Sequence, residues 1–269
     1  MKRVAVIILN YMNYKETITC VNSVFLQKYK EYQIVVVDNG SQNESYQILK
    51  KYYTNNDLVQ VLRVRKNYGF AKGNNIGIKY ARERFGAEFM LLINSDTELL
   101  DENYINVILS KYKKEIGVIG SEIILRNGKK QRPYWEFVYF PATLLYYFKI
   151  INQVYVMSET ENFIDNKLKK YKKELLLHGS AFMLTPAYFE YYDGLYSRTF
   201  LYTEEILLYI MCRRVGLGLA YTNETSIIHK EDQSSKYLYM NNSVEKMKHM
   251  MHSYKYVVWE SFMDYIRKK

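Results

Sequence analysis

The fold is decided by the stretch Phe89-Met90-Leu91-Leu92-Ile93-Asn94-Ser95-Asp96-Thr97-Glu98, in which an apolar run long enough for a buried strand ends in amide and acidic side chains. Two earlier segments repeat this form: residues 4–9 run into Asn10, and residues 34–37 run into Asp38. Ligands of open α/β sheets bind outside the carboxyl ends of the strands. The three endings therefore predict one crevice for a polar ligand, and a phosphorylated ligand is favoured.

Length and composition indicate a globular protein. The 269 residues suffice for one large or two small domains, and 48% hydrophobic content can supply a sizeable core. The longest charge-free apolar stretch, residues 137–148, is well short of the roughly 20 residues that a spanning helix needs. Residues 1–3 lead straight into a strand-like run without a signal-peptide cleavage site, so we expect a cytoplasmic protein.

The charge and the cysteines narrow the classes of partner. A net charge of +10 fits binding to phosphates, to an anionic membrane surface or to nucleic acid. No zinc-finger spacing or RNA-recognition motif appears in the sequence, so we expect no nucleic-acid partner. Cys20 and Cys212 are far apart and form no metal-binding or disulfide pattern, which predicts that both are core residues.

Strand-like runs alternate with amphipathic helical stretches up to about residue 120, the pattern of a mostly parallel sheet with helices on both faces. The predicted helices span residues 15–27, 44–53, 74–85 and 101–114. Residues 121–171 lose this regularity and are rich in aromatic side chains, so we interpret them as a substrate-facing insertion. Later elements are predicted at residues 175–184, a helix near 186, a helix at 204–215, and strands at 217–221 and 226–229.

The last part of the sequence predicts an amphipathic helix of about five turns. Apolar side chains recur there at spacings of three and four, at Met247, Met251, Tyr254, Val258, Phe262 and Tyr265. We therefore divide the chain into a domain at 1–235 and a helical extension at 236–269. Within the domain, residues 1–120 are expected to form the half with the crevice and residues 121–235 the other half.

The commonest nucleotide-binding motifs are absent from the sequence. Neither a glycine-rich dinucleotide fingerprint nor a lysine-containing P-loop occurs, so the crevice must hold its ligand with side chains and a metal. Asp38 can accept hydrogen bonds from a base, and Asp96 can bind a hard cation that bridges a diphosphate. The alternative for Asp38 is a turn cap, because the residues after it also favour a turn.

Six motifs follow one another in a characteristic order: Asn10-Tyr11, residues 35–41, residues 67–77, residues 92–96, residues 178–184 with 193–195 and 200–205, and Ile227-Ile228-His229. Together they resemble family 2 glycosyltransferases of the GT-A fold, and the match covers about residues 3–230. Within the family the chain is most similar to the rhamnosyltransferase-like branch that builds bacterial capsule and O-antigen polysaccharide. The resemblance implies that residues 1–120 bind the nucleotide-sugar and residues 121–235 the acceptor.

The resemblance implies a nucleotide-sugar site at the first strand ends. Asp38 would bind the uracil or thymine base, with Asn10 and Asn39 nearby. Residues 67–77 would form a loop around the base and ribose, in which glycines allow close backbone approach. The residues assigned to this loop are Asn67, Gly69, Gly73 and Asn75.

A metal site is implied by the same resemblance. Asn94-Ser95-Asp96 occupies the place of the family's Asp-x-Asp motif, with an amide instead of its first acid. One carboxylate is therefore missing, which leaves open whether Glu98 contributes. His229 resembles the second ligand, and together with Asp96 it would bind Mn²⁺ or Mg²⁺.

Glu204 and Glu205 replace the family's acidic pair at the start of a helix. The resemblance implies that Glu205 is the catalytic base that removes a proton from the acceptor hydroxyl. The alternative is that both carboxylates only stabilise the first helical turn. The family's further Asp and Arg are replaced here by Leu207 and Met211, which puts the acceptor contacts in doubt.

The sequence therefore predicts an inverting, metal-dependent glycosyltransferase that moves a sugar from a dTDP- or UDP-linked donor to a lipid-linked oligosaccharide of the cell surface. Rhamnose is the first candidate for the sugar. The expected location is cytoplasmic, with peripheral association at the inner face of the membrane through the terminal helix. The alternatives are a non-catalytic sugar-nucleotide or glycan-binding module and a membrane-peripheral interaction protein.

Overall fold

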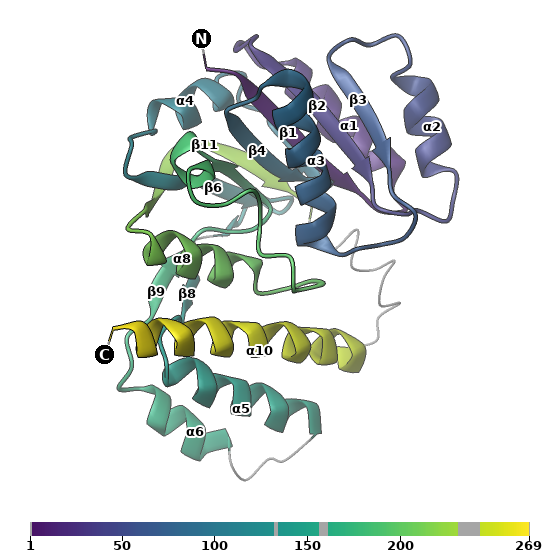
Figure 1. Ribbon diagram of the computed structural model, residues 1–269. Helices are drawn as coiled ribbons and strands as arrows, with labels where there is room; N and C mark the ends of the chain where they lie inside the picture. The colour runs from purple at the N-terminus through teal and green to yellow at the C-terminus, as the bar shows by residue number, and fades with distance from the viewer. Residues whose placement is uncertain (1, 132–133, 156–160, 231–242, 269) are drawn as a thin grey trace.

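A computed structural model describes residues 2–131, 134–155, 161–230 and 243–268. Its main sheet is mixed, and nine of its strands lie in the described residues. They are β1 (Val4–Asn10), β2 (Tyr32–Asp38), β3 (Val59–Arg63), β4 (Phe89–Asn94), β5 (Thr97–Glu98), β6 (Ile116–Leu125), β7 (Lys130–Gln131), β10 (Ala181–Leu184) and β11 (Gly218–His229). Their order is β3-β2-β1-β4-β10-β6-β11-β5, with β7 beside β6 (Figure 1).

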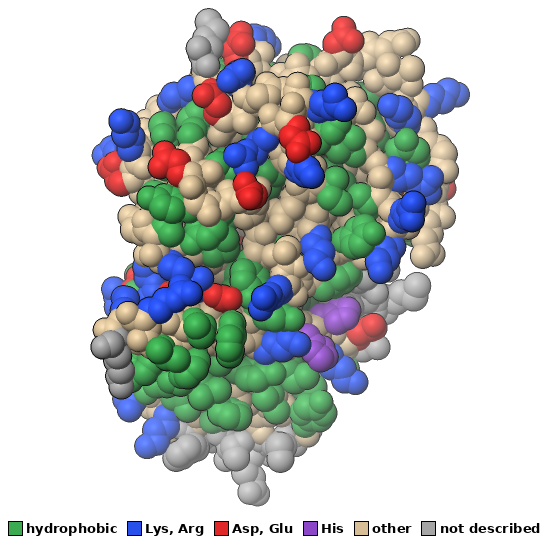
Figure 2. Space-filling model, in the orientation of Figure 1, with side chains coloured by type: hydrophobic (Ala, Val, Ile, Leu, Met, Phe, Trp, Pro, Cys, Tyr) green, Lys and Arg blue, Asp and Glu red, His purple; other side chains and the backbone are tan. Residues whose placement is uncertain are grey.

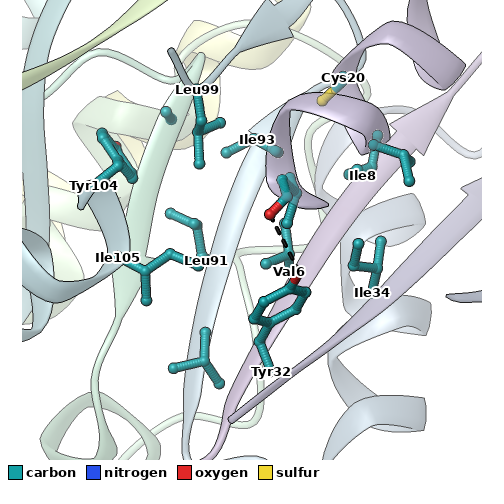
Figure 3. Packing of buried hydrophobic residues seen from close by; sticks show 14 of the residues in the cluster. Val6, Ile8, Cys20, Tyr32, Ile34, Leu91, Ile93, Leu99, Tyr104 and Ile105 are labelled. Carbon is teal, nitrogen blue, oxygen red and sulfur yellow. Dashed lines mark hydrogen bonds between the residues drawn. The ribbon is translucent and has the colours of Figure 1, made fainter. Parts of the chain in front are cut away.

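The first four strands are parallel, as predicted, and their side chains are buried on both faces of the sheet. Val6 and Ile8 point to a core shared with α1 (Tyr14–Phe25) and α4 (Tyr104–Ser110), which Figure 3 shows in close view. Ile7, between them, points to the opposite core under α3 (Phe70–Phe85). Because successive apolar side chains point to opposite faces, helices cover both faces of the sheet.

The helices of this half occur where the sequence predicts them, but two of them differ in extent. Helix α2 (Ser45–Tyr52) agrees closely with the prediction, whereas α4 is shorter than the predicted helix at 101–114 at both ends. Helix α3 begins at Phe70, four residues before the predicted start at Asn74, so residues 70–77 are helical and the predicted loop around the base is wrong over that range. Helix α3 contains Gly73 and Gly77 where it packs closely on the side chains of β1. A larger residue would collide there, since a Cβ at position 77 would lie 2.6 Å from Ile7 Cγ2.

Residues 121–171 contain more regular structure than their sequence suggests. Beyond the end of β6, strand β8 (Tyr134–Glu136) pairs with β9 (Glu174–Leu176) in a small separate sheet. Two helices follow β8 in the chain, α5 (Ala142–Tyr155) and α6 (Glu161–Leu168). The interpretation of this region as an irregular insertion is therefore wrong, because the region contains these two helices.

The later part of the chain also folds largely as predicted. It contains α7 (Pro186–Phe189) and α8 (Glu204–Arg214). The two predicted strands after α8 are one strand, β11, with a register irregularity between Thr222 and Ser226. Cys20 and Cys212 are both fully buried and free, which confirms the core assignment.

The terminal helix is α10 (Ser243–Arg267), and it packs on α5 and α8 below the main sheet (Figure 1). Tyr254 and Val257 of α10 are buried against α5 and α8. Two arginines of α8 hold the same helix through carboxylates: Arg214 Nη2 lies 2.8 Å from Glu260 and Arg213 Nη2 lies 2.6 Å from Asp264. The predicted boundary between residues 235 and 236 lies outside the described residues.

Within the described ranges, none of the helices combines the length and the apolar composition that crossing a bilayer requires.

Candidate active site

The ends of the first strands meet as predicted, because parallel pairing places Asn10 directly beside Asp38. Asn10 Nδ2 donates to Asp38 Oδ2 at 2.7 Å, and the backbone N–H of Ser41 donates to Asp38 Oδ1 at 3.1 Å. The bond from Ser41 is the local turn bond that the capping alternative requires. Each carboxylate oxygen can accept a further hydrogen bond, so the cap and a base-binding role are compatible.

A second network joins the end of β2 to the residues before α3. Asn39 Nδ2 donates to Asn67 Oδ1 at 3.0 Å and to the Gly69 carbonyl at 3.1 Å, while its own Oδ1 accepts from Tyr68. Gly69 has a φ of 83°, and a Cβ there would collide with the carbonyl oxygen of Phe200. Glycine is therefore required at position 69 by the protein's own backbone.

Two other residues assigned to the nucleotide site are engaged within the protein. A Cβ at Gly73 would lie 2.5 Å from Leu9 Cδ1, so this glycine permits close packing of α3 on β1. The side chain of Asn75 bonds both backbone groups of Leu195, with distances of 2.8 Å to its carbonyl and 2.7 Å from its N–H. These contacts tie α3 to the segment before α8.

The residues predicted to bind a metal are brought together at the ends of β4 and β11. His229 Nε2 lies 3.5 Å from Asp96 Oδ1, and both side chains are buried. Two atoms that bind one Mg²⁺ at right angles, each about 2.1 Å from it, are about 3 Å apart, so this spacing fits a shared ion. Among the described residues no cluster of three or more His, Cys, Asp or Glu side chains could hold a metal. Such an ion would therefore need ligands from a substrate, as Mg²⁺ commonly has.

Glu98 is paired with a lysine that follows His229. Lys230 Nζ lies 2.7 Å from Glu98 and 2.6 Å from Glu16, and its side chain is only 8% exposed. Burial lowers the pKa of Lys230, but the hydrogen bonds to Glu16 and Glu98 outweigh it and the net shift is upward. The carboxylate of Glu98 therefore already shares the positive charge of Lys230 with Glu16.

His178 lies next to His229, with ring centroids 5.7 Å apart. Its Nδ1 accepts the backbone N–H of Ser180 at 3.1 Å, so the ring carries its proton on Nε2 when neutral. Burial and the neighbouring His229 lower the pKa of His178 to about 4. The imidazole is therefore neutral near neutral pH.

A cavity of about 500 Å³ adjoins these residues and contains both members of the acidic pair. Asn94, His178 and Gly179 line it on the side of the strand ends, and Glu204 and Glu205 line it at the start of α8. The N–H of Gly179 donates to Glu205 Oε1 at 3.0 Å. The two carboxylates therefore face the same cavity as the end of β4.

The two glutamates have different surroundings. Glu204 is held by a long hydrogen bond of 3.4 Å from the Thr199 hydroxyl, whereas Glu205 accepts a backbone N–H. Burial, together with the charge of Glu205, raises the pKa of Glu204 to about 8. Burial and the neighbouring charge therefore favour the protonated form of Glu204, whereas the backbone N–H of Gly179 donates to the Glu205 carboxylate.

The backbone before this pair is strained. Tyr202 and Thr203 have φ values of 72° and 71°, in the left-handed region that bulky and β-branched residues rarely adopt. Both residues line the cavity. Strain of this kind costs about 1–3 kcal/mol and is concentrated at functional sites.

The sequence did not single out several residues of this region. His178 lies in one of the motifs that carry the family resemblance, but the sequence assigned no role to it. Lys230 directly follows His229, the predicted metal ligand. Glu136, Tyr146 and Tyr254 also line the cavity, and they come from the insertion and the terminal helix. No local pattern could have linked these three to Glu205.

Comparisons with known proteins agree with this architecture. The family model described as Glycosyl transferase family 2 matches residues 5–189. The low-salt glycan biosynthesis hexosyltransferase Agl10 of Haloferax volcanii is 26% identical over 201 residues, which are 74% of this chain and 59% of that protein. Glycosyltransferase GlyG of Streptococcus pneumoniae is 26% identical over 112 residues, which are 42% of this chain and 36% of that protein. The chain thus spans less than two thirds of either relative.

Solved structures show the same fold. The crystal structure of S. aureus TarS 1–349 superposes with a TM-score of 0.56 at 16% identity, covering 97% of this chain and 70% of that one. The structure of the same protein in complex with UDP-GlcNAc gives a TM-score of 0.58 at 17% identity, covering 86% and 59%. The predicted GT-A fold, with its curled mixed sheet and a C-terminal helix, is confirmed.

Proposed function

The chain belongs to glycosyl transferase family 2, and we propose that it is an inverting enzyme that transfers a sugar from a nucleoside-diphosphate donor to a lipid-linked, surface-polysaccharide acceptor. The observation that carries the proposal is the placement of the Glu205 carboxylate in the same cavity as Asn94, at the end of β4. Catalysis and nucleotide binding then share one crevice at the carboxyl edge of the sheet.

In this proposal Glu205 removes the proton from the acceptor hydroxyl as it attacks the sugar. A general base must be ionised and within reach, and Glu205 is held in place by the N–H of Gly179. Glu204, which keeps its proton near neutral pH, can donate a hydrogen bond to the acceptor or the sugar. Asp38, with Asn10 and Asn39 beside it, would bind the uracil or thymine base.

Asp96 and His229 would hold Mn²⁺ or Mg²⁺ when the donor is bound. The ion would neutralise the diphosphate that leaves. Asn94 offers an amide oxygen in place of a second carboxylate, which suits a site where the phosphates complete the coordination. The pairing of Glu98 with Lys230 supports an assignment of the ligand set without Glu98.

The nature of the sugar and the acceptor follows from the resemblance to the rhamnosyltransferase-like branch. A dTDP-linked rhamnose donor is the first candidate and a UDP-linked hexose the second. The acceptor would be a growing capsule or O-antigen chain on a lipid carrier at the cytoplasmic face of the membrane.

The outer face of α10 supports a peripheral position on an anionic membrane. Lys248, Lys255, Trp259 and Ile266 recur at spacings that place them on one side of the helix, and all four are exposed. Figure 2 shows apolar side chains gathered over this part of the molecule, with lysine and arginine around them. Such a basic and aromatic face suits the interface of an anionic bilayer.

Nucleotide-sugar turnover tests the proposal. The protein would be screened by thermal shift against UDP-, dTDP- and GDP-linked sugars with Mn²⁺ or Mg²⁺, because a ligand that binds only the folded state raises its stability. Hydrolysis of the bound donor would then be followed by release of the nucleoside diphosphate. Absence of both binding and hydrolysis with all donors would overturn the proposal.

Membrane association has its own test. The protein would be sedimented with vesicles of phosphatidylglycerol and phosphatidylcholine, beside a Lys255→Glu/Trp259→Ser double variant. We expect binding to the anionic vesicles only, reduced in the double variant. Equal sedimentation of both proteins would remove the role of α10.

A further inference from the structure

The cavity that contains Glu205 continues to a second wall that belongs to neither the nucleotide crevice nor the acidic pair. This wall is formed by Gln131 of β7, Glu136 of β8, Tyr146 of α5, and Met250 and Tyr254 of α10. The whole cavity has a volume of about 500 Å³, within the range of about 300–1,000 Å³ for small-ligand sites. The insertion and the terminal helix thus complete a site whose other wall carries the chemistry.

Two buried hydroxyl groups on the lining residues lack a partner. Tyr254 is 2% exposed and Thr203 is 7% exposed, and within the described part of the chain neither hydroxyl makes a hydrogen bond. A buried polar group without a partner costs about 1–3 kcal/mol. Their location in the lining of one cavity suggests that a ligand supplies the missing bonds.

The charge of the lining restricts the class of ligand. Three carboxylates line the cavity, from Glu136, Glu204 and Glu205, and its described lining contains no lysine or arginine. A phosphate or carboxylate group would be repelled at the wall that carries Glu136, whereas neutral hydroxyl groups can donate to the acidic oxygens. The lining also includes the apolar surfaces of Tyr146 and Met250. A neutral ligand with many hydroxyls and an apolar face, such as a sugar ring, satisfies both requirements.

Glu136 is the polar centre of this wall. The backbone N–H of Phe137 donates to its Oε1 at 3.0 Å. Burial raises the pKa of Glu136, although that hydrogen bond and the charge of Lys173 act in the opposite direction. Its charge also contributes, after burial, to the raised pKa values of Tyr146 and Tyr254, so the carboxylate lies near both tyrosines.

We propose that Glu136, Tyr146 and Tyr254 form the subsite for the terminal sugar ring of the acceptor, with Glu136 accepting hydrogen bonds from its hydroxyls and Tyr254 exchanging one. The proposal rests on the proposed glycosyl transfer, because it takes the cavity around Glu205 as the place of reaction. It assigns a specificity role to α10: the helix closes the acceptor site on its inner side.

Conservative variants test the subsite. Tyr254→Phe removes only the partnerless hydroxyl, and Glu136→Gln keeps the shape of the side chain. The matched control is Tyr256→Phe, which makes the same change two residues away on α10, at a side chain that packs on Tyr196 instead of lining the cavity. Thermal unfolding verifies folding, and Tyr254→Phe is expected to be at least as stable as the wild type.

Binding of simple glycosides gives the readout. Methyl glycosides of glucose, galactose, N-acetylglucosamine and rhamnose would be titrated by saturation-transfer NMR with saturating UDP, and UDP affinity would be measured separately by calorimetry. We expect at least one glycoside to bind, with Kd raised about 3–10-fold in Tyr254→Phe and in Glu136→Gln, the effect of losing one hydrogen bond. Tyr256→Phe should match the wild type, and UDP affinity should be unchanged in every variant.

The outcomes separate this inference from the proposed function. If UDP binds but no glycoside does, or if Kd is unchanged in both pocket variants, the subsite assignment is wrong. If neither UDP nor dTDP binds the wild type, the proposed function itself is wrong.

Discussion

The carboxylate of Glu205 is pressed against the backbone of Gly179: its Oε1 accepts the Gly179 N–H at 3.0 Å, and a Cβ at position 179 would collide with that same oxygen. The second glutamate of the acidic pair and the glycine after His178 are thus fitted to each other. Position 179 needs glycine because of the approaching carboxylate, since its own φ is not in the left-handed region.

Gly179→Ala should therefore displace the Glu205 carboxylate while leaving the backbone unstrained. We expect kcat for transfer to fall by about 10-fold or more, since misplacement by about 1 Å can cost on the order of 100-fold. Donor affinity should stay near that of the wild type. The control is Gly218→Ala, whose Cβ would lie 3.3 Å from Ile116 Cδ1, outside the cavity. Equal loss of activity in both variants would indicate a general packing effect.

Glu205→Gln should lower kcat by about 10²–10⁴-fold, the contribution of a positioned general base, with donor affinity unchanged. Glu204→Gln should raise the acceptor KM more than it lowers kcat. The effect on kcat should be small, because a neutral amide resembles the protonated acid. Single-turnover transfer compares the chemical steps directly. Collapse in Glu204→Gln with a normal step in Glu205→Gln would reverse the assignment.

The raised pKa of Glu204 predicts a dependence of stability on pH. Because the pKa of Glu204 is about 8 in the folded protein and 4.5 for an ordinary glutamate, the folded protein keeps a proton between these pH values that the unfolded chain releases. This contribution to the free energy of unfolding is full below pH about 4.5 and is lost as pH rises through about 8. Urea unfolding from pH 5 to 9 should show a flatter profile for Glu204→Gln. Glu190→Gln, at an exposed carboxylate, serves as the control.

Asp38→Ala should weaken donor binding by about 1.5–3 kcal/mol, the range for a hydrogen bond to a charged group. Selectivity between bases should decrease as well. Because Asn10 also loses its 2.7 Å partner, Asp38→Asn is the better-matched variant for folding. Calorimetric titration with UDP and dTDP measures both effects, and unchanged affinity for both nucleotides would contradict the role.

Asp96→Ala should abolish the metal dependence of nucleotide binding, because it removes the carboxylate beside His229, while Glu98 is held by Lys230. Titration of UDP with and without EDTA measures the difference. A variant that still responds to EDTA and turns over normally would show that the metal lies elsewhere. Glu98→Gln should retain the metal effect.

The sequence predicted the strand ends because each shows a local signal, an apolar run followed by a polar side chain, as at Asn10, Asp38 and Asn94. It misplaced the start of α3, because Gly69 and Gly73 look like loop residues. The structure gives Gly73 a different reason, its contact with Leu9, which no local pattern reveals. Packing between distant segments decided this boundary.

The helices of the insertion were missed for a related reason. α5 contacts both α6 and α10, so apolar residues occur around much of its surface and mask the usual helical period. The wall of the cavity was beyond sequence reasoning altogether. Glu136 and Tyr254 are separated by more than a hundred residues, and only the tertiary fold brings them near each other.

The attachment of α10 has a consequence for biosynthesis. Domains begin to fold from the N-terminus while the ribosome is still adding residues. The residues proposed to bind the base, Asn10, Asp38 and Asn39, lie near the start of the chain, whereas the wall with Met250 and Tyr254 requires a helix that is synthesised last and secured by Arg213 and Arg214. The ribosome therefore completes the proposed nucleotide-binding strands long before the helix that closes the proposed acceptor subsite.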